Sequence, residues 1–182
     1  MPFTPFHMGP GLAIKAVAGR HFSLIVFGFA QVAIDIEPLV RILRGDSVLH
    51  GFTHTYLGAT LIAVAVIFAG RPVCQSLLDW WNAGLSSKWL ARFRSPAPIS
   101  WRATVTGAFI GTYSHVFLDG IMHVDLQPYA PFSTANNMLG FVSIDALHLF
   151  CAGAGAAGVV GMLGLVLWRG RRQPCRGASS RK

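Results

Sequence analysis

The chain has 182 residues, of which 53% are apolar and only 12% are charged, and its formal net charge is +8. About a quarter of the residues in an ordinary soluble domain are charged, so the composition argues against that class and predicts an integral membrane protein with several spanning segments. The basic residues flank long apolar runs and form no aromatic-interleaved patch, so we expect no nucleic-acid partner.

Neither the cysteines nor the N-terminus indicates a secreted protein. Cys74, Cys151 and Cys175 are dispersed without C-x-x-C spacing, so they predict neither a disulfide framework nor a zinc ribbon. The first residues, M-P-F-T-P-F-H, contain no basic region and no small-residue cleavage site, and we expect no cleaved signal peptide.

The first two apolar runs, residues 8–18 and 22–34, predict a short helical hairpin. A first arm of this length rises only about 18 Å, against a hydrocarbon core of about 30 Å, so it would cross part of a bilayer. An alternative is one interfacial helix followed by a single span that runs to Leu43 with a kink at Pro38.

The middle of the chain contains two further helical runs and one segment of different character. Residues 56–69 are apolar, whereas residues 73–94 are basic and rich in tryptophan. The latter predict an amphipathic helix on the cytoplasmic membrane face, or alternatively a loop helix packed on the bundle. Residues 101–122 would form about 33 Å of helix, enough to span, and residues 124–140 are predicted to be a loop.

The last apolar run covers residues 141–168, and its glycine- and alanine-rich stretches are suited to close helix contacts. Residues 169–182 form a basic tail, predicted to be disordered and cytoplasmic. The predicted fold is therefore all-α: a single transmembrane domain over residues 1–168, with about five hydrophobic helices and one amphipathic helix.

The basic residues predict the orientation of this bundle. With the helices in the order above, all of the fifteen lysines and arginines except Arg41 and Arg44 lie at one end. Basic residues concentrate on the cytoplasmic side of membrane proteins. We therefore expect a multi-pass protein of the inner membrane whose C-terminus is cytoplasmic.

Most histidines and carboxylates are predicted to lie at the opposite end. His115 and Asp119 are four residues apart and share one face of a helix, and His123 continues that face. Ionisable groups at membrane depth are costly, and they indicate a functional site. The other residues expected at this end are His7, His50, His54, His148, Asp35, Glu37, Asp46, Asp125 and Asp145.

Imidazole and carboxylate groups at these spacings are the ligands that Zn²⁺ requires, and Mn²⁺ and Mg²⁺ are alternatives. His50 and His123 are further candidates, although a histidine pair such as His50 and His54 at the mouth of a span is more often interfacial than ligating, and a solvated loop explains His123 equally well. Asp145 and His148 are expected to have structural or supporting roles. The predicted metal ligands are His7, Asp35, Glu37, His54, His115 and Asp119.

The order of these motifs resembles a known family. An early histidine, His7, is followed by the acidic pair Asp35 and Glu37, by F-T-H at residues 52–54, and by S-H-x-x-x-D at residues 114–119. This pattern, over most of residues 1–135, is similar to that of the YdjM/YbcI-type predicted membrane-bound metal-dependent hydrolases. There are departures: the family's acidic motif usually reads D-x-D-H, and His50 stands one residue nearer to F-T-H.

The resemblance implies hydrolysis by a metal-activated water, with Glu37 and Asp119 as catalytic residues and Glu37 bridging metal ions or acting as the base. The substrate would be a phosphoester or a small or lipid-linked molecule, met at the lipid bilayer. A transporter or an ion- or proton-conducting protein could use the same residues. A purely structural polar layer is the third alternative. Transport requires polar residues toward the cytoplasmic end, where runs 22–34, 56–69 and 141–168 contain almost none.

Overall fold

The computed structural model describes residues 5–85, 94–95 and 98–171, and every regular element in this part of the chain is helical. The all-α prediction is therefore confirmed for these residues. The predicted bounds of the first helix and of the helix over 101–122 agree with the structure. In chain order the elements are η1 (Pro5–His7), α1 (Met8–Ala18), η2 (Gly19–His21), α2 (Leu24–Ile34), α3 (Ile36–Arg44), η3 (Phe52–His54), α4 (Tyr56–Ala65), the π-helical η4 (Val66–Gly70), α5 (Arg71–Gly84), α6 (Trp101–Met122) and α7 (Ile144–Arg171).

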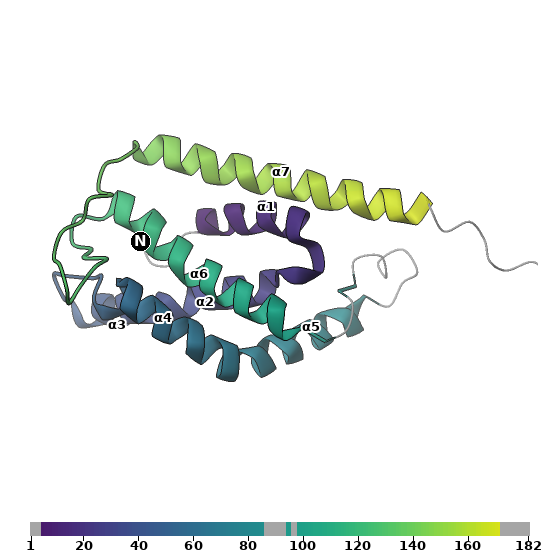
Figure 1. Ribbon diagram of the computed structural model, residues 1–182, viewed down its shortest axis with the longest axis horizontal. Helices are drawn as coiled ribbons and strands as arrows, with labels where there is room; N and C mark the ends of the chain where they lie inside the picture. The colour runs from purple at the N-terminus through teal and green to yellow at the C-terminus, as the bar shows by residue number, and fades with distance from the viewer. Residues whose placement is uncertain (1–4, 86–93, 96–97, 172–182) are drawn as a thin grey trace, which may run out of the picture.

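The first two helices form the predicted hairpin. Gly19, with φ of 53°, ends α1, and the Lys15 ammonium donates to the carbonyls of Gly19 and Phe22 at 2.8 and 2.7 Å. Ser23 then caps α2 by accepting a hydrogen bond from the Val26 amide. With 11 residues, α1 is a short arm, and it packs mainly against α7 (Figure 1).

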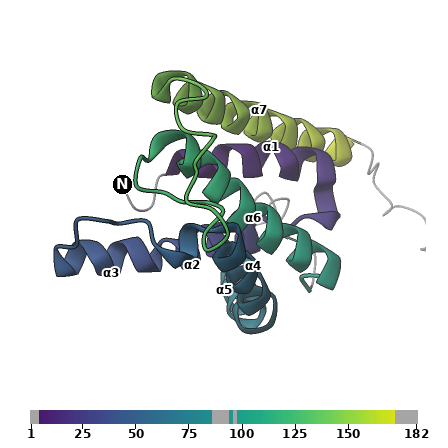
Figure 2. The same cartoon turned by 60° about the vertical axis from the view of Figure 1, so that its left-hand side comes forward.

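The chain bends after α2 at Asp35, not at Pro38. Pro38 lies in the first turn of α3, where a helix tolerates a residue without an N–H because that donor has no partner inside the helix. Gly45, with φ of 77°, ends α3. Figure 2 shows α3 projecting from the bundle, so the loop that follows it returns to the helix ends from outside.

The third helix is longer than the apolar run that predicted it. Tyr56–Gly84 is one continuous helix of 29 residues, formed by α4, η4 and α5. The wider turns of η4 precede Pro72 and accommodate its missing N–H, so the helix does not stop there. This corrects the prediction of a separate amphipathic helix over 73–94: its first half is the end of the third helix, and residues 86–93 lie outside the described residues.

Two helices, Tyr56–Gly84 and Ile144–Trp168, are long and apolar enough to cross a membrane. Core helices of soluble proteins can meet the same standard of length and composition. α6 has 22 residues, but polar side chains lie along its buried face. α7 continues to Arg171, three residues into the segment predicted as a tail, and residues 172–182 lie outside the described part of the chain.

The helices pack as α7 on α1, α2 on α6, and α6 on α4 (Figure 1). Glycines permit two of these contacts. A Cβ at Gly158 of α7 would lie 2.4 Å from the Leu12 carbonyl carbon of α1, and a Cβ at Gly107 of α6 would lie 2.7 Å from the Ser23 carbonyl oxygen. The small-residue surface predicted on the last helix is thus in contact with α1.

The topology brings four helix ends together. The start of α1, the end of α2, the start of α4 and the end of α6 meet at one end of the bundle, on the left in Figure 1, together with the loop after α6. The opposite ends of α1 and α6 carry the basic residues Lys15 and Arg102. The polar end is where the candidate site forms.

Candidate metal centre

The face of α6 that packs against α2 carries two glycines, followed by two ionisable residues. On α6, Gly107 and Gly111 are followed at the same four-residue spacing by His115 and Asp119, all of them buried. A spacing of four places side chains on one helix face. The glycines let α2 approach closely, and the same face then carries an imidazole and a carboxylate facing Asp35 at the end of α2.

A tight turn supplies the next ligand. η3 holds the sequence F-T-H, and Thr55 caps α4 by accepting a hydrogen bond from the Gly58 amide at 2.9 Å. A Cβ at Gly58 would lie 2.0 Å from the Phe52 carbonyl oxygen, so the turn packs against the first turn of α4. This arrangement places the His54 ring, which is 0% exposed, against the carboxylates of the other helices.

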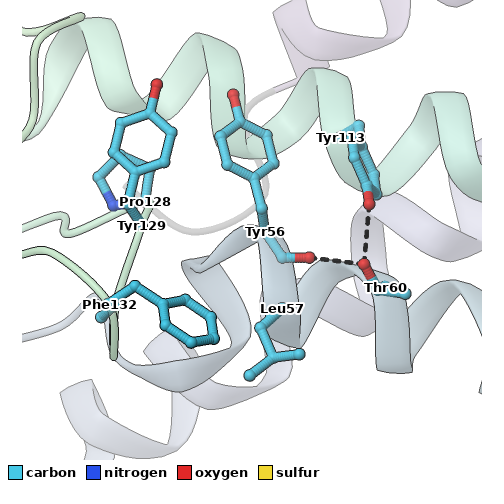
Figure 3. A pocket seen from close by; sticks show the side chains of 8 residues that line it. Tyr56, Leu57, Thr60, Tyr113, Pro128, Tyr129 and Phe132 are labelled. Atoms are coloured by element: carbon cyan, nitrogen blue, oxygen red, sulfur yellow. Dashed lines mark hydrogen bonds between the residues drawn. The ribbon is translucent and has the colours of Figure 1, made fainter.

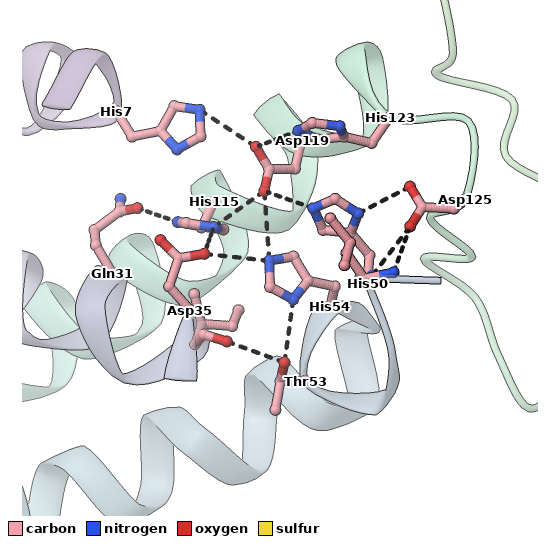
Figure 4. Close-up of polar contacts among 12 residues, drawn as sticks. His7, Gln31, Asp35, His50, Thr53, His54, His115, Asp119, His123 and Asp125 are labelled. Atoms are coloured by element: carbon pink, nitrogen blue, oxygen red, sulfur yellow. Dashed lines mark hydrogen bonds and ion pairs between the residues drawn. The ribbon is translucent and has the colours of Figure 1, made fainter. Parts of the chain in front are cut away.

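Four ligand atoms converge in the buried centre, which we call the primary site: Asp35, His54, His115 and Asp119 (Figure 4). Nε2 of His115 lies 3.2 Å from Asp35 Oδ1 and 3.1 Å from Asp119 Oδ2. Nε2 of His54 lies 3.6 and 3.4 Å from the same two atoms. Metal–ligand bonds of about 2.0–2.1 Å in a tetrahedron put neighbouring ligand atoms about 3.3 Å apart. The four nitrogen–oxygen spacings, out of the six edges of such a tetrahedron, therefore match those of a zinc site.

Hydrogen bonds at Nδ1 fix the orientation of the His54 and His115 rings. Thr53 Oγ1 donates to the Ile34 carbonyl, so its contact of 3.1 Å with His54 Nδ1 requires that nitrogen to be the donor. The side-chain oxygen of Gln31 accepts from His115 Nδ1 in the same way. Both rings are thereby fixed with Nε2 toward the carboxylates, as metal-binding histidines are held.

Each of the two Nε2 atoms is buried and lies between the Asp35 and Asp119 carboxylates, with which it forms ion pairs. Two imidazole nitrogens and two carboxylates thus surround a common point, which is the donor set that a divalent cation requires. The residues of the primary site therefore fit a bound divalent cation.

Three more histidines surround the other side of Asp119. Its Oδ1 lies 3.5 Å from His7 Nε2 and 3.9 Å from His123 Nε2, and His50 Nε2 lies 4.0 Å from Oδ2. Asp125 accepts from His50 Nδ1 at 2.9 Å and from the backbone amide of the same residue at 3.1 Å. The structure thus brings both additional candidates, His50 and His123, to the centre (Figure 4).

Electrostatics keep these outer groups in the states that metal ligands need. Burial lowers the pKa of His7 to about 4, although Asp119 opposes the shift, so the imidazole is neutral at physiological pH. Burial alone would raise the pKa of Asp125, but the hydrogen bonds from His50 and from two backbone amides outweigh it and lower the pKa to about 2. Asp125 is therefore ionised and can hold His50 by its Nδ1–H.

Glu37 is the one predicted ligand that the structure places apart. Its Oε1 accepts from Arg41 Nη2 at 2.7 Å, and its Oε2 accepts from the Thr53 amide at 2.7 Å. Gly51 has no side chain to obstruct this pair, since a Cβ there would lie 2.0 Å from Glu37 Oε1. Glu37 thus holds the residue that orients His54.

Sequence reasoning missed Gln31. The signal was present, because Gln31 is the one polar side chain inside the apolar run 24–34 and stands four residues before Asp35. His148, expected to have a supporting role, stacks on Phe6 with ring centroids 4.7 Å apart. It is thereby linked to the segment that carries His7.

Two pockets lie near the polar end. One, of about 410 Å³, is lined by His50 and Asp125 together with Arg41, Phe52 and Leu57, so it opens on the histidine side of the centre. The other, of about 360 Å³, is lined chiefly by aromatic residues and is shown in Figure 3. Its lining residues include Tyr56, Tyr113, Tyr129 and Phe132.

Comparison of the chain with protein-family models, with curated proteins and with solved structures finds no match.

Proposed function

We propose that the protein is a membrane-embedded, divalent-metal-dependent hydrolase. The observation that carries the proposal is the primary site: two imidazoles and two carboxylates, all buried, in which each Nε2 atom lies 3.1–3.6 Å from oxygens of both carboxylates. The resemblance to the YdjM/YbcI-type family is part of this proposal and points to the same chemistry.

Charge balance supports a cation in the primary site. Asp35 and Asp119 are 3% and 4% exposed, and an isolated buried carboxylate carries a large desolvation cost. His54 and His115 supply lone pairs at Nε2, because their Nδ1–H groups are committed to Thr53 and Gln31. A divalent ion neutralises the two carboxylates without requiring protons on the imidazoles.

The surface of α7 supports insertion in a membrane. Only 11% of the most apolar 18-residue stretch of this helix is buried inside the protein. Its exposed residues include Leu149, Phe150 and Val160. A helix that is apolar on its exposed sides is suited to lipid contact. Together with the basic residues at one end, this favours a multi-pass protein of the inner membrane with a cytoplasmic C-terminus.

A bound divalent ion would lower the pKa of a water molecule toward neutrality and polarise the scissile bond. The residues of the chain would hold the metal and connect it to a pocket for the substrate. Asp119 presents one oxygen to the primary site and the other to His7 and His123. His50 connects this centre to the pocket of about 410 Å³, where Phe52 and Leu57 offer apolar surface. A divalent ion beside an apolar pocket suits an anionic substrate with an apolar portion, such as a lipid-linked phosphoester.

A transporter with the same residues is less well supported. Beyond the polar end, the buried core between α2, α4 and α6 is chiefly apolar, including Val26, Ala30 and Val66. The buried hydroxyls of Thr104 and Thr112 donate to nearby backbone carbonyls. A conducting path would need polar groups there. The described core therefore favours a site that opens at one end.

Hydrolysis of phosphoesters by the detergent-purified protein tests the proposal. Aryl phosphate monoesters, diesters and phospholipids would be assayed with Zn²⁺ or Mn²⁺, after chelation, and after metal is restored. We expect metal-dependent cleavage that is lost in Asp119→Asn. The proposal is wrong if the metal-loaded protein cleaves none of these substrates but carries divalent ions across proteoliposome membranes.

A further inference from the structure

The second oxygen of Asp119 faces a group of imidazoles that the primary site does not use. His7 is 3% exposed, and neither of its ring nitrogens forms a hydrogen bond with another described residue. Its Nε2 nevertheless points at Asp119 Oδ1 from 3.5 Å (Figure 4). Burying an imidazole without hydrogen bonds is costly, and a cation between Nε2 and Asp119 Oδ1 would supply both atoms with a close partner.

His50 and His123 approach the same carboxylate from another side, His123 toward Oδ1 and His50 toward Oδ2. Their rings stack with centroids 4.2 Å apart, and both Nε2 atoms lie within 4.0 Å of the Asp119 carboxylate. Asp125 accepts from His50 Nδ1 and so directs the other nitrogen of that ring toward Asp119. A carboxylate behind a histidine is a common support for a metal ligand.

We propose that a second divalent cation binds between His7, His123 and Asp119 Oδ1, with His50 as its further ligand, so that Asp119 bridges two ions. The inference rests on the proposed function, because the bridging carboxylate also belongs to the primary site. The spacings of 3.5–4.0 Å exceed the tetrahedral edge of about 3.3 Å. The second ion therefore binds more weakly than the first.

A carboxylate-bridged pair of ions narrows the class of substrate. Two ions about 3.5–4 Å apart stabilise both the attacking and the leaving oxygen of an in-line displacement, which is the arrangement of many phosphoesterases. The second ion lies on the side of His50, which lines the pocket of about 410 Å³. Phosphoesters are accordingly the substrates that this centre fits.

Metal titration of the full-length protein in detergent tests the second site. The protein is stripped with chelator and equilibrated with stepped concentrations of Mn²⁺, with bound metal measured by elemental analysis and by electron paramagnetic resonance. We expect the wild type to bind one ion and then, at higher concentration, a second. Exchange coupling between the two will broaden the hyperfine-split signal of isolated Mn²⁺.

His7→Ala and His123→Ala should each bind one ion and retain the isolated Mn²⁺ signal. His148→Ala is the matched control, since this histidine lies at the same end and stacks on Phe6, and it should bind two. His123 is 25% exposed and follows the end of α6, so its replacement leaves the helix packing intact.

The possible outcomes separate the two proposals. A wild type that saturates at one ion overturns the second site and leaves the proposed function standing. A wild type that binds none overturns both. The second site is also overturned if folded His7→Ala and His123→Ala keep two coupled ions, or if both lose all metal.

Discussion

The side chains behind the ligands decide how well the primary site is organised. Gln31 and Thr53 bind no metal in this account, yet they fix which nitrogen of His115 and His54 faces the carboxylates. Groups of this kind typically change metal affinity about 10–100-fold when they are removed.

Replacing Gln31 by leucine tests this role. Gln31→Leu removes the acceptor for His115 Nδ1–H and should weaken Zn²⁺ binding about 10–100-fold, measured by competition with a chromogenic chelator. Gln31→Glu keeps an acceptor oxygen at the same place and should remain closer to the wild type. Equal affinity of Gln31→Leu and wild type would show that the ring is held by other contacts.

Asp35 and Glu37, which the sequence pattern treats alike, should behave differently. Glu37→Gln leaves the primary site complete and should retain its metal, because Glu37 contacts Arg41 and the Thr53 amide. Asp35→Asn removes a ligand, and its affinity should fall further than the 10–100-fold expected for supporting groups. Chelator competition on both variants gives the comparison. If Glu37→Gln lost as much metal as Asp35→Asn, Glu37 would be a metal ligand, contrary to this expectation.

Spacing within one helix could be predicted from the sequence, and pairing between segments could not. His115 and Asp119 share a face because they are four residues apart on α6. The contact between His50 and Asp125 joins residues 75 positions apart and depends on how the loop after α6 folds back. The hydrogen bond from the Thr53 amide to Glu37, 16 positions away, depends similarly on how the loop after α3 returns to the bundle, which apolar patterning does not reveal.

Hydrophobic runs predicted where most helices lie, but a proline wrongly suggested the end of one helix. α1 and α6 have the predicted bounds, because each begins and ends where the apolar pattern does. Gly70, Arg71 and Pro72 suggested a helix end, but the π-helical η4 carries the helix on to Gly84. Wider turns of this kind have no signature in residue composition.

The contact of α1 with α7 should be sensitive to single methyl groups. Gly158→Ala would place its Cβ against the backbone of Leu12 and Ala13, so we expect a loss of about 1–3 kcal/mol in stability. Gly153→Ala on the same helix meets no atom within 4 Å and should be neutral or stabilising by up to about 1 kcal/mol. Thermal unfolding of the two variants in one detergent measures the difference. Equal stability would contradict the close packing.

The two ends of the helix bundle differ in charge and polarity. The ligands gather at one end, Lys15 lies near the opposite end of α1 and Arg102 near the opposite end of α6, and most exposed side chains of α7 are apolar. Such a distribution is the one expected when the ends face different aqueous compartments and the middle faces lipid. The metal centre would then lie near the outer surface.

Reporter fusions test this orientation. A reporter that is active only in the cytoplasm, fused after Lys182, should be active, and one inserted in the loop between α3 and η3 should be silent. A reporter that is active only outside the cytoplasm should give the reverse pattern. Activity of the external reporter at the C-terminus would contradict the proposed orientation.

The most direct measurement is the metal content of the purified protein, with the wild type compared with His54→Ala and His115→Ala. His21→Ala, which changes a histidine at the opposite end of the bundle, is the control. The wild type and the control should carry at least one divalent ion per chain, and the two site variants should lose it while remaining folded. A wild type without stoichiometric metal, or site variants that keep it fully, would contradict the metal centre.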